Sequence, residues 1–459
     1  MKLKIKIIYL FVFSIALLSC SNSDDSGTTS SSYTQYGEAF ENMPKSEDAI
    51  IYQVNIRAFS KEGTLNGVRA RLADIKALGA NVVYLMPIYP VGKLKAAYGL
   101  GSPYAVQDYK AVNTDFGTLE DLQALVKEAH AMDMAVILDW VANHTAWDNA
   151  WITSHPDWYQ QDEAGNIIIP PGTNYNDVAQ LNFDNKEMRA AMIDAMQYWV
   201  YNANVDGFRC DYADFVGQGF WTEAITKVRS VKKQRLLMLA EGSRLNHFQA
   251  GFDFTFGFNF FSSLEQVFDG SKPATYLQDS NATEYANNYK ESQRVVRYTT
   301  NHDVNLSDGT PYELFKGRNG SLAAFVVAAY MKSVPMIYNG QEIGYNKRID
   351  YFNRTPIDWT TADAGVLAEY KKLIAFRSAS NAIKSGSYTG YSSSEISAFT
   401  MKKDGETVLV LSNLTNATVN YIVPPALAAT AWKDGFTGNA TPLTAQVTLA
   451  PYQYLVLKN

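Results

Sequence analysis

The chain has little cysteine, little histidine and no apolar segment of membrane-spanning length. Of its 459 residues, two are cysteine and five are histidine. Its net charge is −6, and it has no basic stripe interleaved with aromatic residues, which argues against a general nucleic-acid binder. The strongest apolar run, residues 7–18, is too short to cross a bilayer comfortably. What remains is a chain with 47% hydrophobic residues, enough to bury a large core in two or three domains.

The first 20 residues have the pattern of an export signal. Three lysines within the first six residues precede the apolar run, and the sequence LLSC follows it at residues 17–20. LLSC resembles a bacterial lipobox, in which the cysteine becomes the lipidated first residue of the mature protein. We therefore predict a signal peptide over residues 1–20 and a lipid anchor on Cys20. A plain cleaved secretion signal is the alternative. With Cys20 lipidated, Cys210 is the one remaining thiol, which excludes an intramolecular disulfide.

A polar tether is predicted over residues 21–47, because SNSDDSGTTSSS offers no apolar periodicity. Its Asp24-Asp25 pair resembles the acidic export signal of Bacteroidetes surface lipoproteins. We expect an outer-membrane lipoprotein exposed at the cell surface, with partners in a surface glycan-utilisation system. The periplasmic face of the membrane and full secretion are the alternatives. The sequence leaves the oligomeric state open.

Between residues 48 and 380, short apolar runs alternate with amphipathic stretches. One stretch, GTLEDLQALVKEAHAMD, has helical periodicity with Thr118 as its expected N-cap. Polar residues at the ends of the apolar runs recur at multiples of ~31 residues, which is the spacing of a (β/α)8 barrel. We therefore predict such a barrel, whose sixth strand lies near FDFTFGF. The other seven runs have the continuous apolar character of buried parallel strands: AIIYQVNIRAF, ANVVYLMPI, MAVILDWVAN, VDGFRCD, LLMLAEG, RVVRYTTNHD and VPMIYNGQE.

Two departures from that spacing define further domains. A surplus of roughly 40 residues over one barrel unit follows the third strand, and it predicts an inserted domain B at about residues 141–181. After residue 381 the pattern becomes alternating, with a turn at Asp404-Gly405 between two strands. We predict an all-β sandwich over residues 381–459.

Four of the predicted strands end in segments that carry acids: LDWVANH, GFRCDYAD, AEGSR and TTNHDVN. In a barrel these ends converge on one cavity, where the carboxylates repel each other and shift each other's pKa. Such a cluster fits either a divalent-metal site or glycoside hydrolysis by a paired carboxylate and carboxylic acid. Arg209 lies on the same strand face as Asp211, and we expect it to hold that acid ionised. Negative neighbours are expected to raise the pKa of Glu241, as a general acid requires.

These four segments resemble, in order and spacing, the signature regions of the α-amylase family of retaining α-glucan-active glycoside hydrolases. YGLGSPYAVQDY, QLN at residues 180–182 and NRTPIDW extend the resemblance to about residues 48–459. The resemblance implies cleavage of α-1,4 bonds in starch-like glucans or maltooligosaccharides. It assigns Asp211 as the nucleophile, Glu241 as the acid/base and Asp303 as the third carboxylate, which grips the sugar hydroxyls.

The resemblance also assigns residues that bind the cleaved sugar. It implies that Tyr104 stacks on the sugar ring, that His144 and His302 bind its hydroxyls, and that Arg209 pairs with the nucleophile. Asp139 is expected to hold the loop after its strand.

The chain departs from the family pattern after the nucleophile. Typical members have lysine and histidine where this chain has Asp214 and Phe215. The missing histidine puts in doubt a structural calcium ion, for which Asn143 and Asp177 are the candidate ligands. The altered pair also leaves open a transglycosylase or cyclomaltodextrinase activity. Two other classes remain open: a non-catalytic, glycan-binding surface lipoprotein and a metal-dependent barrel hydrolase.

Overall fold

The computed structural model describes residues 33–231, 235–286, 290 and 293–459. The predicted signal peptide, its lipid-bearing Cys20 and the first part of the tether lie outside the described residues. Within the described ranges, no helix is long and apolar enough to cross a membrane.

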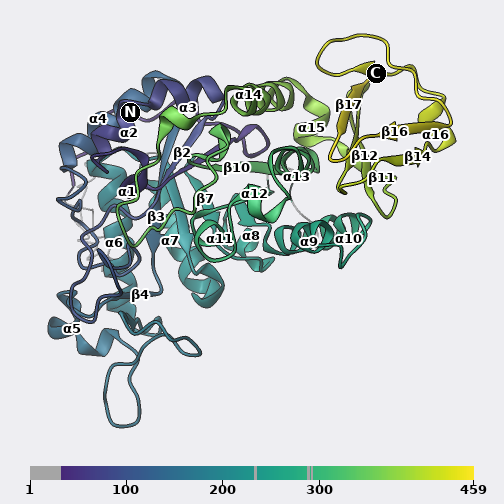
Figure 1. The fold of residues 1–459 in the computed structure, drawn as a ribbon. Coiled ribbons are helices and arrows are strands. Elements are labelled where there is room, and N and C mark those ends of the chain that lie inside the picture. The colour runs from purple at the N-terminus through teal and green to yellow at the C-terminus, as the bar shows by residue number, and fades with distance from the viewer. Residues whose placement is uncertain (1–32, 232–234, 287–289, 291–292) are drawn as a thin grey trace, which may run out of the picture. The chain divides into compact units, whose positions relative to one another are not determined.

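Eight parallel strands form the closed barrel that the sequence predicts (Figure 1). The strands are buried along their whole length, which explains why their sequences are almost continuously apolar. The sixth barrel strand, expected near FDFTFGF, is β8. In chain order the barrel strands are β1 (Ile51–Val54), β2 (Val82–Leu85), β3 (Ala135–Val141), β6 (Gly207–Asp211), β7 (Leu237–Ala240), β8 (Phe254–Phe256), β9 (Arg294–Arg297) and β10 (Val334–Tyr338).

Helices surround these strands (Figure 1). The predicted helix after β2 is α4, which Thr118 caps in a reciprocal capping box with Asp121. The longer helices are α3 (Leu72–Leu78), α4 (Leu119–Ala131), α6 (Lys186–Asn202), α7 (Gln218–Ser230), α9 (Phe258–Phe268), α10 (Tyr276–Glu284), α13 (Arg318–Tyr330) and α14 (Ala364–Ala379). The shorter helices are α1 (Ile56–Phe59), α2 (Leu65–Arg69), α5 (Trp151–Ser154), α8 (Asn246–Ala250), α11 (His302–Ser307), α12 (Pro311–Leu314), α15 (Asn381–Ser385) and α16 (Pro425–Ala428). Single 3-10 turns are η1 (Ser46–Asp48), η2 (Pro156–Trp158), η3 (Ala213–Phe215), η4 (Gln341–Ile343) and η5 (Trp359–Thr361).

The chain leaves the barrel after β3 and returns to it at α6. In the intervening excursion, β4 (His144–Ala146) pairs antiparallel with β5 (Val178–Gln180). His144 opposes Gln180 in that pair, so the excursion begins and ends next to the barrel mouth. The insertion after the third strand is thus present as predicted.

The C-terminal part consists of antiparallel sheets, as the alternating pattern predicts. Asp404 and Gly405 both have positive φ, 51° and 86°, in the two-residue turn between β12 and β13. Apolar side chains of both sheets form a separate core. One sheet has the order β11–β12–β13–β17–β15 and the other pairs β14 with β16; the strands are β11 (Ser387–Gly390), β12 (Ile396–Lys403), β13 (Glu406–Asn413), β14 (Val419–Ile422), β15 (Lys433–Asp434), β16 (Gln446–Leu449) and β17 (Tyr454–Lys458).

Residues 33–47, assigned to the tether from the sequence, are packed against the barrel. The Phe40 ring is only 7% exposed and stacks on His130 with ring centroids 4.6 Å apart. The hydroxyl of Tyr33 donates to Asp194 at 3.0 Å. This segment contains three aromatic side chains that the polar stretch before it lacks. Residues 33–47 are therefore not part of a free tether, because aromatic burial attaches them to the barrel; the rest of the predicted tether lies outside the described residues.

Candidate active site

A pocket of about 540 Å³ opens at the carboxyl ends of the barrel strands. The three acids predicted to be catalytic, Asp211, Glu241 and Asp303, all line it. So do three of the predicted sugar-binding residues and one of the two predicted calcium ligands: Tyr104, His144, His302 and Asp177. The structure therefore brings together side chains from five separate loops that the sequence placed at strand ends.

Arg209 lies beneath the pocket and connects three acids. Its side chain is 1% exposed. Nη1 lies 2.7 Å from Asp139 and 2.8 Å from Asp211, and Nη2 contacts Glu241. A buried guanidinium is stable only with such partners, because an unpaired charge in the interior is strongly unfavourable. One cation thus fixes the positions of three carboxylates.

The strand register explains how these side chains meet. Asp139 of β3 lies opposite Arg209 of β6, and Cys210 lies opposite Ala240 of β7. Because side chains alternate along a strand, Arg209 and Asp211 point to one face and Cys210 to the other. Cys210 is fully buried, and burial raises the pKa of its thiol well above the usual value. Cys210 is therefore unreactive packing.

The charge balance of the cluster favours retention of a proton. Burial and then the charge of Glu241 raise the pKa of Asp211 well above its usual value, while Arg209 acts in the opposite direction. The expectation that Arg209 holds Asp211 ionised is therefore wrong for this structure, because burial and the charge of Glu241 outweigh the guanidinium. Three carboxylates share one cation, so the group as a whole holds a proton more readily than isolated acids do.

Asp139 belongs to this cluster and does not merely hold a loop. Besides its ion pair with Arg209, it accepts hydrogen bonds from the hydroxyls of Tyr84 at 2.6 Å and Tyr104 at 3.0 Å. Its side chain is fully buried. The loop-holding role expected from the resemblance is thus corrected: Asp139 anchors Arg209 and the ring of Tyr104.

The two predicted histidines are neutral at physiological pH. Burial lowers the pKa of both His144 and His302 to about 4. Gln53 lies 2.8 Å from Nδ1 of His302, and the Tyr104 hydroxyl lies 2.6 Å from Nε2. The rings of Tyr104 and His302 also stack, with centroids 5.3 Å apart. Neutral imidazoles in fixed orientations are suited to hydrogen bonding with uncharged hydroxyl groups.

Glu241 is fixed by the turn that follows Asp211. Its Oε2 accepts the Tyr212 backbone N–H at 2.8 Å, and its backbone carbonyl accepts the Ala213 N–H at 3.0 Å. Tyr212 adopts the left-handed conformation, φ 50° and ψ 35°, which a tyrosine rarely does without a local constraint. Asp303 is held less tightly: its side chain is 49% exposed, and the Tyr351 hydroxyl lies 3.3 Å from it.

The departure at Asp214 has a structural explanation. Its carboxylate accepts the backbone N–H groups of Ser243 and Arg244 at 3.2 and 3.3 Å, and it lies 2.6 Å from Nε2 of His247. Burial raises the pKa of Asp214, but these hydrogen bonds outweigh it and the pKa lies below its usual value. Asp214 thus ties the loop that follows Asp211 to the loop that carries Glu241.

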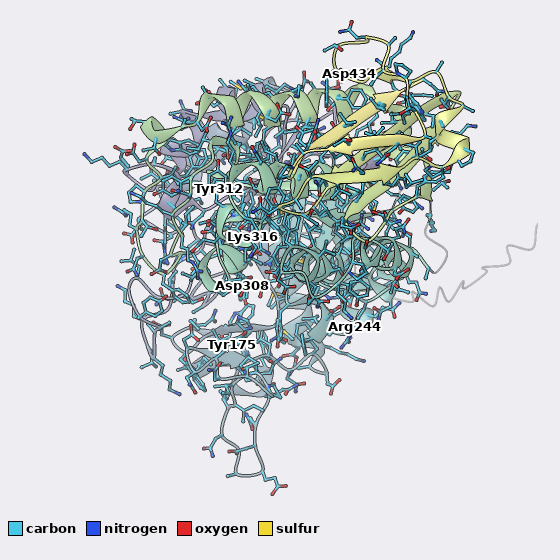
Figure 2. The ribbon with its side chains drawn as sticks, turned by 45° about the vertical axis from the view of Figure 1, so that its right-hand side comes forward. Tyr175, Arg244, Asp308, Tyr312, Lys316 and Asp434 are labelled. Atoms are coloured by element: carbon cyan, nitrogen blue, oxygen red, sulfur yellow. The ribbon has the colours of Figure 1, made fainter. Side chains whose placement is uncertain are left out.

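Besides Tyr104, the pocket has aromatic side chains that sequence reasoning missed. Tyr212 and Phe215 stack with centroids 4.0 Å apart, and Phe215 is 61% exposed. Tyr175, from the excursion, also lines the pocket, and the guanidinium of Arg244, from the loop after β7, lies 5.9 Å from the centroid of the Phe215 ring; both residues are labelled in Figure 2. Their one sequence signal is the abundance of aromatic residues, which does not separate a binding wall from core packing.

The predicted calcium ligands do not form a ready cation site. The amides of Asn143 and Gln180 bond each other reciprocally at 3.0 and 3.1 Å, which engages the oxygen that would bind the ion. Asp177 lies at the pocket wall. In the part of the chain that the structure describes, no group of three or more His, Cys, Asp or Glu side chains could hold a metal.

The chain is similar in sequence and in structure to known proteins. The family model "Alpha amylase, catalytic domain" matches residues 19–167 and 172–372. Alpha-amylase 2 of Dictyoglomus thermophilum is 27% identical over 426 residues, covering 83% of this chain and 72% of that protein. A cyclomaltodextrinase of Thermoanaerobacter pseudethanolicus is 24% identical over 415 residues, covering 83% and 69%. The crystal structure of an alpha-amylase from Lactobacillus plantarum superposes with a TM-score of 0.81 at 27% identity, covering 90% of this chain and 99% of that one. The chain therefore belongs to the alpha-amylase family of glycoside hydrolases.

Proposed function

We propose that this chain is a retaining glycoside hydrolase that cleaves α-1,4 bonds of starch-like glucans or maltooligosaccharides. The observation that carries the proposal is the sharing of one buried guanidinium by Asp211 and Glu241 at the base of the pocket. Because both acids contact Arg209, their carboxyl groups lie close together. A retaining mechanism requires the two carboxyl groups to lie about 5–5.5 Å apart, closer than the acids of an inverting enzyme, and shared contact with one guanidinium is compatible with that separation.

The reaction proceeds in two displacements. In the first, Asp211 attacks the anomeric carbon while Glu241 gives its proton to the glycosidic oxygen, so that the leaving sugar departs with a new hydroxyl. In the second, Glu241 takes a proton from water, which attacks the same carbon and releases Asp211. The first displacement therefore requires an ionised Asp211 and one proton on Glu241.

The other pocket residues act on the sugar. Asp303, half exposed at the pocket, is placed to accept hydrogen bonds from hydroxyl groups. His144 offers a neutral imidazole at the pocket wall, and Tyr104 presents a ring held by Asp139 and His302. A sugar hydroxyl that bonded Nε2 of His302 would share it with the Tyr104 hydroxyl. These groups favour the distorted sugar of the transition state only if they are already fixed before it forms.

The test is the release of reducing sugar from soluble starch. We expect Asp211→Asn and Glu241→Gln to lower kcat by at least ~10⁴-fold, with unchanged thermal unfolding, because each removes an acid that acts in both displacements. The exposed Glu163→Gln, in the excursion, is the matched control and should keep full activity. Near-wild-type turnover by either active-site variant would refute the assignment.

Transglycosylation or cyclodextrin opening is the second candidate function. It is favoured by the cyclomaltodextrinase relative and by Asp214 and Phe215, which replace the lysine and histidine of typical members. Chromatography of the products from maltoheptaose and from cyclodextrins separates it from simple hydrolysis. Products longer than the substrate would indicate transfer to a second sugar. Binding to starch without any bond cleavage would instead support the glycan-binding lipoprotein.

Calcium dependence remains a prediction. Thermal unfolding and starch hydrolysis of the chelator-treated protein, with and without added calcium chloride, would test it. A rise in Tm on addition of calcium would support a structural ion. A loss of activity without a change in Tm would favour the metal-dependent hydrolase.

We propose that the chain is anchored to the outer membrane through lipid on Cys20. The lipobox-like LLSC and the polar stretch that follows it support this proposal. Metabolic labelling with palmitate, with Cys20→Ala as the control, tests the anchor. Protease treatment of intact cells then tests exposure at the surface, and co-purification tests for partners in a glycan-utilisation system.

A further inference from the structure

We propose that Gln53 is a positioning residue, which fixes the tautomer of His302 so that Nε2 of the imidazole carries the proton. The proposal rests on the proposed function and deepens it, because His302 lines the pocket and is expected to bind the cleaved sugar. Gln53 belongs to β1 and is not one of the residues that line the pocket. It would therefore act on the reaction through His302 and not by contact with the sugar.

Gln53 lies inside the barrel, against the ring of His302. In the strand register it lies opposite Tyr338 of β10 and Tyr84 of β2. Gln53 is 1% exposed and His302 is 2% exposed. The contact between them is therefore shielded from solvent, and a hydrogen bond in such surroundings is stronger than one in water.

The contact with His302 explains why an amide occupies this buried position. Nε2 of Gln53 lies 2.8 Å from Nδ1 of His302. Oε1 is also buried, and within the part of the chain that the structure describes it has no hydrogen-bond partner. Removing an amide from water is unfavourable, and an apolar side chain of similar length, such as methionine, would avoid that cost. The hydrogen bond to His302 therefore accounts for a glutamine here.

The hydrogen bonds on the other side of the ring determine which nitrogen is protonated. The Tyr104 hydroxyl lies 3.0 Å from Oδ2 of Asp139 and 2.6 Å from Nε2 of His302. It has one proton, which it donates to Asp139 because a bond to a charged partner is the stronger one. Nε2 must then supply the proton between itself and the Tyr104 oxygen. Nδ1 is left as an acceptor, which matches the N–H of Gln53.

His302 is neutral at physiological pH in spite of the acids around it. Burial lowers the pKa of His302 to about 4, and Arg209 of β6 acts in the same direction. Asp139 of β3 and Glu241, after β7, act in the opposite direction. Oδ2 of Asp303, the next residue in α11, lies 3.3 Å from Nε2. The ring therefore holds a single proton.

The position of that proton decides what the ring offers to the pocket. A neutral imidazole has one donor nitrogen and one acceptor nitrogen. With Gln53 bonded to Nδ1, Nε2–H faces the oxygen atoms of Tyr104 and Asp303. The other tautomer would direct a lone pair at the same oxygen atoms, which is repulsive. Gln53 thus keeps the pocket side of His302 a donor to oxygen atoms, including those of a sugar.

Nitrogen NMR of the full-length protein, labelled with ¹⁵N-histidine, measures the tautomer directly. The chain has only five histidines, and the variant His302→Asn identifies the signal of His302 by its loss. In the unmodified protein we expect a neutral ring protonated at Nε2 between pH 6 and pH 8, since its pKa is about 4. This measurement does not depend on catalytic activity.

Gln53→Glu keeps the length of the side chain and replaces the donor by an acceptor. We expect the signal of His302 to become that of a ring protonated at Nδ1, with a raised pKa, because a carboxylate stabilises that proton. We expect kcat on maltoheptaose to fall about 100-fold and KM to change less than threefold, because misplacement of one group at the reacting sugar affects the chemical step. Gln53→Met, which only removes the donor, should lower kcat about tenfold.

The matched control is Gln293→Glu, the same substitution at the opposite end of the barrel. Gln293 is 8% exposed, precedes β9 and donates to the Phe248 carbonyl at 3.1 Å. We expect this variant to unfold at a lower temperature. The signal of His302 should stay unchanged and kcat should change less than twofold, because Gln293 does not contact the site.

Four outcomes would overturn the proposal. A proton on Nδ1 of His302 in the unmodified protein would contradict the assigned tautomer. An unchanged His302 signal in Gln53→Glu, or equal losses of kcat in Gln53→Glu and Gln293→Glu, would leave Gln53 a structural role only. If Gln53→Glu does not fold, unchanged kcat in Gln53→Met would refute the proposal. Inactivity of the unmodified chain on maltoheptaose would instead refute the proposed function, while the NMR result would still test Gln53.

Discussion

Glu342 provides a quantitative test of how the barrel tolerates buried charge. It lies in η4, after β10, and is 5% exposed, and the Tyr52 hydroxyl donates to its Oε1 at 2.5 Å. Burial raises the pKa of Glu342 to about 7, although the hydrogen bond from Tyr52 acts in the opposite direction. The folded protein therefore favours the protonated acid, and an ionised Glu342 is a cost to stability. We predict that Glu342→Gln stabilises the protein at alkaline pH.

The sign and size of this effect on stability follow from the difference between the pKa of Glu342 in the unfolded protein and in the folded protein. An unfolded glutamate ionises near pH 4.5 and the folded one near pH 7. Stability from the protonated form is fully present below pH 4.5 and is lost as pH rises to about 7. A difference of 2.5 pKa units corresponds to at most ~3.4 kcal/mol, since one unit is about 1.36 kcal/mol. Glutamine has similar shape and no charge, so it should avoid this loss.

Urea unfolding at pH 5.0 and pH 8.0 measures the effect. Glu342→Gln should have nearly the stability of the unmodified protein at pH 5.0 and exceed it by about 2–3 kcal/mol at pH 8.0. Tyr52→Phe is the control, because it removes the hydrogen bond without removing the acid. It should destabilise the protein at pH 8.0, where the lost hydrogen bond is charge-assisted. The reasoning is refuted if the glutamine variant changes stability equally at both pH values.

Three further predictions concern the site and the barrel. Arg209→Met leaves Asp139 and Asp211 without their cation and should lower the free energy of unfolding by about 3–5 kcal/mol at pH 7. Part of this loss should be recovered at pH 5, where the carboxylates take up protons. Urea unfolding at both pH values measures the difference. Asp214→Ala releases the loop that carries Glu241 and should lower kcat on maltoheptaose by ~10-fold or more, with little change in KM. Asp214→Asn keeps hydrogen-bonding atoms at this position and should restore part of the lost kcat. An equal effect of Asp214→Ala and Asp214→Asn on KM alone would argue for substrate contact instead. Gly207→Ala should cost more than ~3 kcal/mol, because its Cβ would overlap the Leu237 backbone, while Gly217→Ala, which meets open space, should cost under ~1 kcal/mol.

The barrel and its acid-bearing strand ends were predictable because both follow from simple rules. Strands buried on both faces are almost continuously apolar, and parallel strands in a closed barrel end at one rim. Asp211, Glu241 and Asp303 could therefore be placed together before any coordinates. β8 was the least clear strand, because it has only three residues between a loop and α9.

The details of the site depend on register and on distant loops, which the sequence does not reveal. The contact between Asp139 and Arg209 requires that β3 and β6 pair at one particular offset. Asp214 could be identified as unusual, but its partner His247 lies in a separate helix. Tyr98 and Phe352 stack on each other although most of the barrel sequence separates their loops along the chain. Such contacts arise from the closure of the barrel and leave no local pattern.

The interior position of Cys210 has a practical consequence for spectroscopy. It is the only cysteine after residue 20, and its side chain is fully buried. In a protein whose Cys20 carries lipid, as proposed, a cysteine introduced on the surface would therefore be the sole site that reacts with a maleimide dye or a nitroxide reagent. Attached one at a time in the β2 loop and at the tip of the excursion, such labels could report whether the pocket mouth narrows when an oligosaccharide binds. No native residue would first have to be removed.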